Sequence, residues 1–249
     1  MTANEGFRGR RALVTGGATG LGLAVSRALL AGGAEVAATY RPGGHTEGIE
    51  ALVAKYGDRV HPCQCDLADS GSVDRAFDEA AGAMSGVDLL VNNAGIWLSN
   101  PFEDIAVRDW DRTFAVNVRA PFILCQRFIR QGVPGKIVNV TSQAAFHGST
   151  SGHADYAASK AALVTMTISL AREVARKGVN ANCVAVGMMR SNMVREALEK
   201  NEESYLARIP KGRVAESEDI TGTVLFLLGP DSDYITGATI DATGGMLMR

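Results

Sequence analysis

The stretch TGGATGLG, Thr15 to Gly22, decides the fold that the sequence predicts. It follows a short apolar run at residues 11–15 and precedes a helical pattern with apolar residues at Leu21, Val25 and Leu29. Glycines at a strand-to-helix turn let the backbone turn tightly and approach a pyrophosphate, which the positive end of the helix stabilises. Glycine also occurs at such turns for purely structural reasons. Its place between the first strand and the first helix favours a dinucleotide site.

Strand and helix patterns alternate from this turn to the end of the chain. Strands are expected at 11–15, 35–40, 59–65, 87–92, 135–141, 179–184 and 236–241. Helices are expected between them, at 21–31, 45–56, 70–84, 104–130, 156–177 and 216–228, with an irregular stretch rich in Met and Glu before the last helix. Apolar strands separated by helices imply a parallel sheet covered on both faces. The sequence therefore predicts an α/β fold, with residues 1–249 forming one doubly wound domain of about seven strands.

The composition excludes several classes of protein. Its 25 basic and 27 acidic residues are interspersed and give a net charge of −2, so no nucleic-acid surface is expected. Apolar runs of about five to eight residues are shorter than the ~20 needed to span a bilayer, and the first residues lack a signal-peptide pattern. A cytoplasmic protein that binds no membrane follows as the expectation. Cysteine and histidine spacing predicts no metal site and favours four buried, reduced cysteines: Cys63, Cys65, Cys125 and Cys183.

The end of the second strand bears on the choice between NAD and NADP. An NAD enzyme is expected to carry Asp or Glu there, to accept hydrogen bonds from the ribose 2′-hydroxyl. This chain has Tyr40 and Arg41 instead, and a guanidinium can hold a 2′-phosphate bidentately. The alternative is that Arg41 is only a solvated loop residue, and Thr19 adds no second cation. We predict NADP(H) in preference to NAD(H). Asp66 is a candidate acceptor for the adenine amine, with helix capping near Asp69 as the alternative.

Tyr156 and Lys160 are four residues apart in a helical pattern, so they share one helical face. A nearby ammonium lowers the pKa of a phenol from its ordinary value near ~10 and suits the phenol to proton transfer. Alone, the pair would more often be a surface pair. Ser142 and Asn92-Asn93-Ala94-Gly95 end two strands at the sheet edge where α/β folds bind ligands. Asn117 lies within the intervening helix, where an amide is uncommon unless it is hydrogen-bonded.

Together and in this order, these motifs resemble the short-chain dehydrogenase/reductase family over essentially the whole chain. The carrying residues are Thr15-Gly16-xxx-Gly20-x-Gly22, Asn92-Asn93-Ala94-Gly95, Asn117, Ser142 and Tyr156-xxx-Lys160. The resemblance implies a Rossmann-type fold and a hydride transfer between a ketone and a secondary alcohol. It also implies that Tyr156 exchanges a proton with the substrate oxygen, and that Ser142 hydrogen-bonds that oxygen. Lys160 would bind the nicotinamide ribose and lower the pKa of Tyr156, and Asn117 would position a water that links Lys160 to solvent.

The expected cofactor contacts come from the glycine loop, the strand ends and the segment after the sixth strand. They are Gly16, Ala18, Thr19, Gly20, Leu21, Gly22, Tyr40, Arg41, Asp66, Leu67, Asn93, Ala94, Gly95, Tyr156, Lys160, Gly187, Met189 and Ser191. One departure from the family pattern is Val186-Gly187 in place of Pro-Gly. Valine does not fix φ as proline does, so we expect a looser loop beside the nicotinamide. Ser191 stands where the family commonly has Thr and keeps the hydroxyl.

Substrate choice is expected to come from residues 96–102, 143–155 and 188–209. Trp97 could form a substrate wall or be covered by a neighbouring helix, and His153 could border the site or be solvated. Met188, Met189 and Met193 begin a segment, near 188–212, that resembles the mobile lid of relatives, with core filling as the alternative.

Residues 209–213 and 241–249 resemble the 3-oxoacyl-carrier-protein reductases, which implies a carrier-bound acyl thioester as one substrate. Arg130 and Lys177 lie near basic positions that meet the acidic carrier in those relatives, although helix ends also favour basic residues. A sugar, polyol or cyclic-alcohol dehydrogenase is the second interpretation. A dinucleotide-sensing protein without catalysis is a third, against which the retained Ser142, Tyr156, Lys160 and Asn117 argue. The resemblance also implies a homotetramer.

Overall fold

The computed structural model describes residues 6–149, 152–191 and 194–249. Within them, one sheet of seven parallel strands has the order β3-β2-β1-β4-β5-β6-β7. The strands are β1 (Arg11–Val14), β2 (Glu35–Tyr40), β3 (Val60–Gln64), β4 (Leu89–Asn92), β5 (Gly135–Ser142), β6 (Val179–Val186) and β7 (Thr239–Ala242). The strand order reverses between β1 and β4, and ligands of such sheets bind at that point, outside the carboxyl ends of the strands. The predicted doubly wound α/β fold is confirmed.

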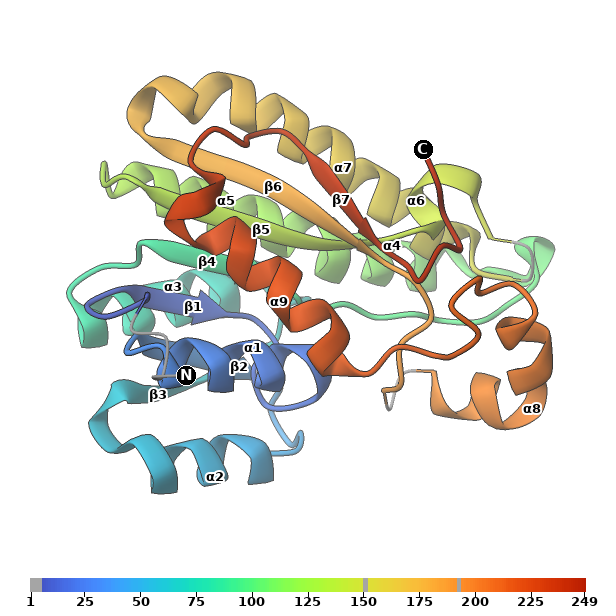
Figure 1. Cartoon of the computed structure of the whole chain (residues 1–249), viewed down its shortest axis with the longest axis horizontal. Coiled ribbons are helices and arrows are strands. Elements are labelled where there is room, and N and C mark those ends of the chain that lie inside the picture. Colours follow the sequence, from blue (N-terminus) through green and yellow to red (C-terminus); the bar gives the residue numbers. More distant parts are fainter. Residues whose placement is uncertain (1–5, 150–151, 192–193) are drawn as a thin grey trace.

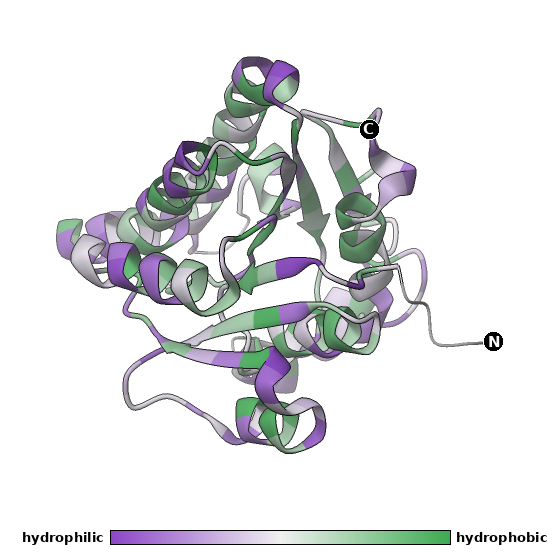
Figure 2. Cartoon of the chain, turned by 90° about the vertical axis from the view of Figure 1, so that its left-hand side faces the viewer, coloured by the Kyte–Doolittle hydropathy of each residue, from purple (hydrophilic) through white to green (hydrophobic). Residues whose placement is uncertain are grey.

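Helices cover both faces of the sheet (Figure 1). Their bounds are α1 (Gly20–Ala31), α2 (Glu47–Tyr56), α3 (Ser70–Met84), α4 (Val107–Phe114), α5 (Ala120–Arg130), α6 (Ala144–His147), α7 (Ala154–Val174), α8 (Arg195–Leu206) and α9 (Ser217–Leu228). Short 3₁₀ turns lie at Gly57–Arg59, Phe102–Asp104, Ala175–Lys177 and Pro230–Ser232. Figure 2 shows apolar residues on the strands and on the inner sides of the helices.

Two apolar cores follow from this layering. One joins the sheet to α1, α2 and α9 through side chains such as Val25, Leu52 and Val224. The other joins it to α3, α5 and α7 through side chains such as Phe77, Phe128 and Val174. Because the central strands are buried on both faces, their registers are fixed and their carboxyl ends align at one edge.

The glycine loop packs too closely for side chains at two of its positions. A Cβ on Gly22 would lie 2.1 Å from the carbonyl oxygen of Gly16, and one on Gly17 would lie 2.7 Å from the Cβ of Ala38. Gly16 itself has a φ of 65°, a conformation that favours glycine. These glycines let α1 begin directly against the end of β1.

The predicted helix at 104–130 is wrong as a continuous α-helix. It is divided into α4, a π-helical turn over Ala115–Arg119 and α5, and it begins at Val107. The backbone stays helical from α4 through the π turn into α5. The sequence pattern therefore does not reveal where the hydrogen bonding changes. Such π turns are rare and often occur at functional sites.

Several other elements and boundaries differ from the prediction. The stretch expected to be irregular before the last helix contains α8, and the short helix α6 follows β5 directly. Strand β6 runs two residues further, to Val186. The last strand begins at Thr239, because Thr236 and Ala238 hydrogen-bond to β6 through side chains: the Thr236 hydroxyl accepts from Ala181, and Ala238 donates to the Asn182 amide.

Candidate active site

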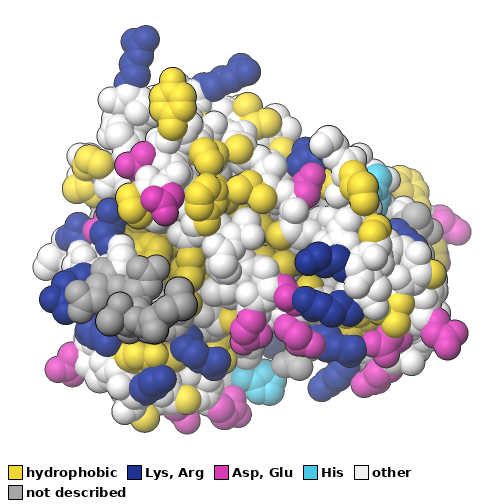
Figure 3. All heavy atoms as spheres, in the orientation of Figure 1, with side chains coloured by type: hydrophobic (Ala, Val, Ile, Leu, Met, Phe, Trp, Pro, Cys, Tyr) yellow, Lys and Arg dark blue, Asp and Glu magenta, His cyan; other side chains and the backbone are white. Residues whose placement is uncertain are grey.

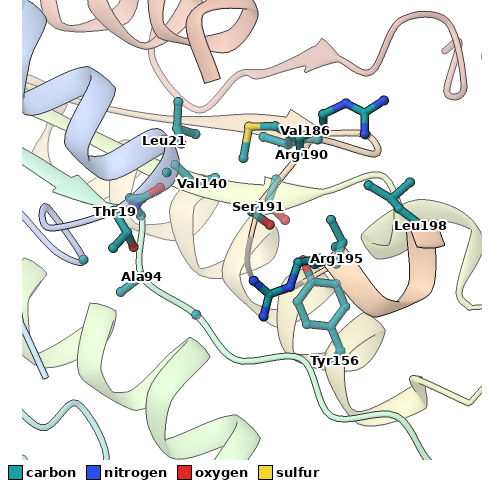
Figure 4. Close-up of a pocket in the computed structure, with 18 of the residues that line it drawn as sticks. Thr19, Leu21, Ala94, Val140, Tyr156, Val186, Arg190, Ser191, Arg195 and Leu198 are labelled. Atoms are coloured by element: carbon teal, nitrogen blue, oxygen red, sulfur yellow. The ribbon is translucent and has the colours of Figure 1, made fainter. Parts of the chain in front are cut away.

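A cavity of about 690 Å³ opens at the carboxyl edge of the sheet, beside the point where the strand order reverses. Figure 4 shows side chains from the glycine loop, β5, β6, α7 and α8 facing it. Its walls include the following predicted cofactor residues: Gly16, Thr19, Gly20, Leu21, Asn93, Ala94, Gly95, Tyr156, Lys160, Gly187, Met189 and Ser191. The structure therefore brings together most of the site residues that the sequence predicts.

Partly buried hydrogen bonds join the glycine loop to the end of β4. The Thr15 hydroxyl accepts hydrogen bonds from the backbone amides of Asn93 (3.0 Å) and Ala94 (3.1 Å). The Asn93 side chain donates to the carbonyl of Thr15 at 2.9 Å. On the other side, the Thr39 hydroxyl of β2 accepts from the amide of Gly16 at 3.1 Å. The loop is held by both neighbouring strands and needs little rearrangement to meet a ligand.

Tyr156 and Lys160 both project from α7 into the cavity, as their spacing predicts. The ammonium of Lys160 lies 5.7 Å from the centre of the Tyr156 ring and donates a hydrogen bond to the carbonyl of Val140 at 2.9 Å. The Ser142 hydroxyl at the end of β5 hydrogen-bonds with the Tyr156 phenol. The phenol and the buried ammonium thus line the cavity, and the Ser142 hydroxyl reaches the phenol from the end of β5.

Burial governs the protonation of both groups. It lowers the pKa of Lys160 from 10.5 to about 8, with the Cys183 thiol opposing the shift. It raises the pKa of Tyr156 above its ordinary value, while the hydrogen bond from Ser142 acts in the opposite direction. Burial therefore outweighs the Ser142 hydrogen bond at Tyr156, and the expectation that Lys160 lowers the pKa of this phenol stays a prediction. The ammonium is turned to a backbone carbonyl, and desolvation dominates.

Asn117 lies in the π turn and is fully buried. Its side-chain oxygen accepts from the amide of Ile96 at 2.9 Å, and its nitrogen donates to the carbonyl of Ile96 and to the Ser159 hydroxyl, both at 3.0 Å. A Cβ on Gly95 would lie 3.1 Å from the Asn117 oxygen and 3.3 Å from the Lys160 ammonium. The side chain of Asn117 therefore fixes the loop after β4 beside Lys160. The proton-relay role expected for it stays a prediction.

A second cavity, of about 120 Å³, adjoins the first at Tyr156, Gly187 and Val194, which line both. Trp97, Ser142 and His153 also line it. The rings of Trp97 and His153 lie 4.4 Å apart, and those of Trp97 and Tyr156 lie 6.3 Å apart. The structure therefore supports Trp97 as a wall of the cavity and His153 as a residue that borders it.

Six predicted cofactor residues do not line the larger cavity: Ala18, Gly22, Tyr40, Arg41, Asp66 and Leu67. Gly22 lies under the loop, and Arg41 and Asp66 are exposed. Arg41 comes two residues after Thr39, which is bonded to the glycine loop. Asp66 accepts a hydrogen bond from the amide of Ala68, and the helix cap of α3 is Asp69, as the alternative interpretation had it.

The cavity also has wall residues that the sequence analysis did not name individually as site residues, most of them within or next to the range 188–209 expected to govern substrate choice. They are Val140, Thr141, Val186, Arg190, Val194, Arg195, Leu198, Glu199 and Glu202. Val140 and Thr141 precede Ser142 on β5, so the strand-end rule could have found them. The range that contains α8 was expected to matter for substrate choice, but the helix itself and the side chains that it turns to the cavity were not predicted, because the stretch carries no strong helical periodicity.

The valine that replaces the family proline does not loosen the chain at its own position. Val186 belongs to β6, pairs with Ala242 of β7 and accepts a hydrogen bond from Gln143 at 3.1 Å. The next residues are tied to Ala215, whose amide donates to Met188 and whose carbonyl accepts from Arg190. Met193 lies outside the described residues.

These features fit a dinucleotide. The N-cap Thr19 makes no side-chain capping bond, so the first amides of α1 face the cavity without that competitor. The glycine cradle has no room for a Cβ at Gly22, and the larger cavity is of the size typical of small-molecule sites.

The remaining surface agrees with the composition. On the face shown in Figure 3, basic and acidic side chains are interspersed. The four cysteines are buried and free, and burial raises the pKa of Cys125 to about 12. Among the described residues, no helix is both long and apolar enough to cross a membrane.

Comparisons with known proteins agree with this geometry. A family model described as enoyl-(acyl carrier protein) reductase matches residues 16–247. A 3-oxoacyl-acyl-carrier-protein reductase from Aquifex aeolicus is 34% identical over 244 residues, covering 96% of this chain and 98% of the relative. An L-xylulose reductase from Bos taurus is 38% identical, covering 96% and 97%.

A solved structure has nearly the same fold. The crystal structure of a blue fluorescent protein from a metagenomic library, in complex with NADPH, has a TM-score of 0.91 and 37% identity, covering 98% of this chain and all of that one. The chain belongs to the short-chain dehydrogenase/reductase family, a family of oxidoreductases.

Proposed function

We propose that this protein is an NADP(H)-dependent reductase or dehydrogenase that interconverts a ketone and a secondary alcohol. The observation that carries the proposal is the placement of Tyr156, where the two cavities meet, with Lys160 on the larger cavity and Ser142 hydrogen-bonded to it on the smaller one, beside the glycine loop at the carboxyl edge of the sheet. NADPH, when bound, supplies the hydride. The cofactor preference is supported by Arg41 and by the NADPH-bound relative.

Each residue of the site has its own role in this reaction. Tyr156 donates a proton to the substrate oxygen in reduction and accepts it in oxidation. Ser142 hydrogen-bonds the same oxygen and holds the carbonyl next to Tyr156. The ammonium of Lys160 stabilises the phenolate and binds ribose hydroxyls, while the first amides of α1 meet the pyrophosphate. Asn93, Ala94 and Gly95 line the cofactor through their backbone, which Thr15 and Asn117 hold in place.

Residues 188–212 act as a lid over this site. Leu198, Ile209 and Val214 form a small apolar cluster of their own, separate from the two main cores. Because so few apolar contacts hold it, the segment can move at a lower cost than the sheet edge.

Two substrate classes have support from relatives. A 3-oxoacyl thioester on a carrier protein agrees with the reductase from Aquifex aeolicus and with basic Arg130 and Lys177. A sugar or polyol agrees with the L-xylulose reductase. An assay with NADPH on acetoacetyl thioesters, L-xylulose and cyclic ketones separates them, and an absence of thioester turnover eliminates the first.

The same assay tests the oxidoreductase itself. We expect NADPH-dependent turnover of at least one ketone in the panel and a higher kcat/KM with NADPH than with NADH. Cofactor binding without turnover of any ketone or alcohol would favour a dinucleotide-sensing protein. A clear preference for NADH would contradict the role of Arg41.

The protein would work as a homotetramer in the cytoplasm. Large apolar side chains are exposed on two surfaces, Trp110, Phe122 and Ile168 on α4, α5 and α7, and Phe226 and Tyr234 near β7. Figure 3 shows apolar side chains gathered over α9 and β7. Two apolar surfaces on each copy suit an assembly with two kinds of interface. Sedimentation at several concentrations measures the number of copies.

A further inference from the structure

We propose that the substrate of this site carries an oxyanion group, a carboxylate or a phosphate, and that Arg208 binds it. The inference rests on the proposed oxidoreductase function, because it names a substrate class for the same site. It concerns the smaller cavity, which adjoins the cofactor cavity at Tyr156.

The described walls of this smaller cavity contain cationic and hydrogen-bonding side chains but no carboxylate. They include Arg208, His147, His153, Tyr205 and Gln143, with neither Asp nor Glu among them. The larger cavity differs, since Glu199 and Glu202 lie on its wall. A ligand group that enters the smaller cavity therefore meets a positive, donor-rich surface.

Arg208 is the permanent charge on that surface. Its side chain is exposed, and within the described residues its guanidinium makes no hydrogen bond or ion pair, whereas its backbone amide donates to Tyr205. Two other arginines of this region are paired. Arg190 contacts Glu202 at 2.6 Å, and Arg213 contacts Asp219 at 2.6 Å. An arginine without a carboxylate partner on a cavity wall is suited to bind a planar oxyanion bidentately.

The other polar groups fit a short, hydroxylated acid. The Nδ1 atom of His153 lies 3.0 Å from the carbonyl of Leu98, so Nδ1 carries the proton of that hydrogen bond and Nε2 is left for another partner. The buried Oε1 of Gln143 has no hydrogen-bond partner among the described residues, and a substrate hydroxyl would supply the donor. The cavity volume of about 120 Å³ equals the liquid volume of about four water molecules. A small acid is the group that suits this space.

Matched pairs of substrates test the proposal. With NADP⁺, the oxidation of 3-hydroxybutanoate is compared with that of its amide, D-gluconate with D-gluconamide, and glycerol 3-phosphate with glycerol. We expect kcat/KM to be about 10- to 100-fold higher for the charged member of at least one pair, the range for one charge-assisted hydrogen bond. Preference within the first two pairs assigns a carboxylate, and preference within the third alone assigns a phosphate.

Arg208→Gln should remove that preference, chiefly through KM, and leave the neutral member of the pair nearly unchanged. Arg208→Lys should restore part of it, because a lysine keeps the charge but not the planar fork. Arg176→Gln is the matched control. Arg176 is an exposed arginine of the 3₁₀ turn Ala175–Lys177, outside both cavities, and its substitution should keep the wild-type preference.

Equal rates within every pair would overturn the proposal. So would a preference that survives Arg208→Gln or is lost only in Arg195→Gln, whose side chain faces the larger cavity beside Tyr156 (Figure 4).

A binding measurement separates this inference from the proposed function. Calorimetry measures the Kd of D-gluconate, 3-hydroxybutanoate and glycerol 3-phosphate for the wild-type protein and for Arg208→Gln. At least a tenfold loss of affinity for one of them in the variant supports the anion site even if no alcohol is oxidised, and in that case only the oxidoreductase function fails. Turnover of neutral alcohols alone, with no Arg208-dependent binding of any acid, keeps the function and refutes the anion site.

Discussion

The carboxyl edge of the sheet and the segment that we propose as a lid, the described residues of 188–212, meet at one cavity but are held in different ways. At the edge, buried or partly buried hydrogen bonds fix each functional group: Thr15 holds the loop after β4, Asn117 holds Ile96, and Lys160 donates to Val140. The lid has exposed charges, a small apolar cluster and a helix with non-helical dihedral angles at Asn201. The difference supports the proposal that the edge carries out the reaction and that the lid selects the substrate.

The largest effect is expected at the edge, from a comparison of two tyrosines. Tyr156→Phe removes the proton donor and should lower kcat by about 10³-fold, the range for a lost general acid. Tyr205→Phe, in the lid, should change kcat by less than about tenfold, because it removes one cavity hydroxyl. Steady-state kinetics on both variants, with NADPH affinity as the control, measures this. Equal losses in the two variants would break the division between edge and lid.

The second prediction concerns Lys160. Lys160→Met should lower kcat/KM by about 10²-fold, because the phenolate loses its ammonium. In the wild-type protein, reduction should decline above about pH 8, where Lys160 loses its charge, and the variant should lack this decline. A pH profile that is the same in both proteins would contradict the assignment.

Lys160→Met should also change how the free energy of unfolding depends on pH. The folded pKa of Lys160, about 8, lies below its value of 10.5 in the unfolded chain. The unfolded chain therefore binds more protons between these values, and the contribution of Lys160 to the free energy of unfolding rises with pH there. Lys160→Met lacks this rise, so its stability relative to wild type should decrease from pH 8 to 10.5. Urea unfolding across this range measures the difference.

A third prediction compares two glycines. Gly22→Ala places a Cβ against the carbonyl of Gly16, so it should lower the free energy of unfolding by about 1–3 kcal/mol and weaken NADPH binding. Gly82→Ala, in α3, meets no atom within 4 Å and should stabilise the protein by about 0.5–1 kcal/mol. If Gly22→Ala bound NADPH with wild-type affinity, the close approach of α1 to the loop would not matter for the cofactor.

A fourth, smaller effect is expected at Arg41. Arg41→Ala should weaken NADPH binding by about tenfold and leave NADH binding unchanged, because only NADPH carries the 2′-phosphate. Arg176→Ala is the control at an exposed site outside the cavities. Equal weakening of both cofactors by Arg41→Ala would show that Arg41 does not read the phosphate.

The smallest effect is expected in the lid. Arg190→Ala breaks ion pairs with Glu202 and Glu216, both exposed enough that their loss should cost about 0.2–1 kcal/mol. Substrate KM should change by less than about fivefold, and high salt should remove the difference from wild type. A loss as large as that of Tyr156→Phe would mean that the lid takes part in the chemistry.

The comparison of edge and lid also explains what the sequence could predict. The glycine loop, Ser142, Tyr156 and Lys160 lie at ends of apolar strands or at helical spacing, so topology alone brings them together. Asn117 was identified, but the π turn that directs its side chain to Ile96 leaves no mark in the hydrophobic pattern.

Other features depend on packing between distant segments. Helix α8 has few apolar residues, so the sequence does not reveal it. Arg195 at its start and Arg208 just after its end line the cavities only because this helix forms. Spacing on α7 predicts only the charge that acts on Tyr156, whereas burial raises the pKa of its phenol. Desolvation depends on the whole surrounding structure, which spacing within one helix does not contain.

The central claim is that the sheet edge transfers a hydride between NADPH and a carbonyl carbon. The most direct measurement follows deuterium from NADPH deuterated at nicotinamide C4 into the product, in wild-type protein with a ketone that it reduces. Our account predicts one deuterium on the carbinol carbon with one of the two C4-deuterated NADPH epimers, and the same label in about 10³-fold less product from Tyr156→Phe. Product that carries no deuterium from either face of the nicotinamide, or that takes it from deuterated water at that carbon, would contradict it.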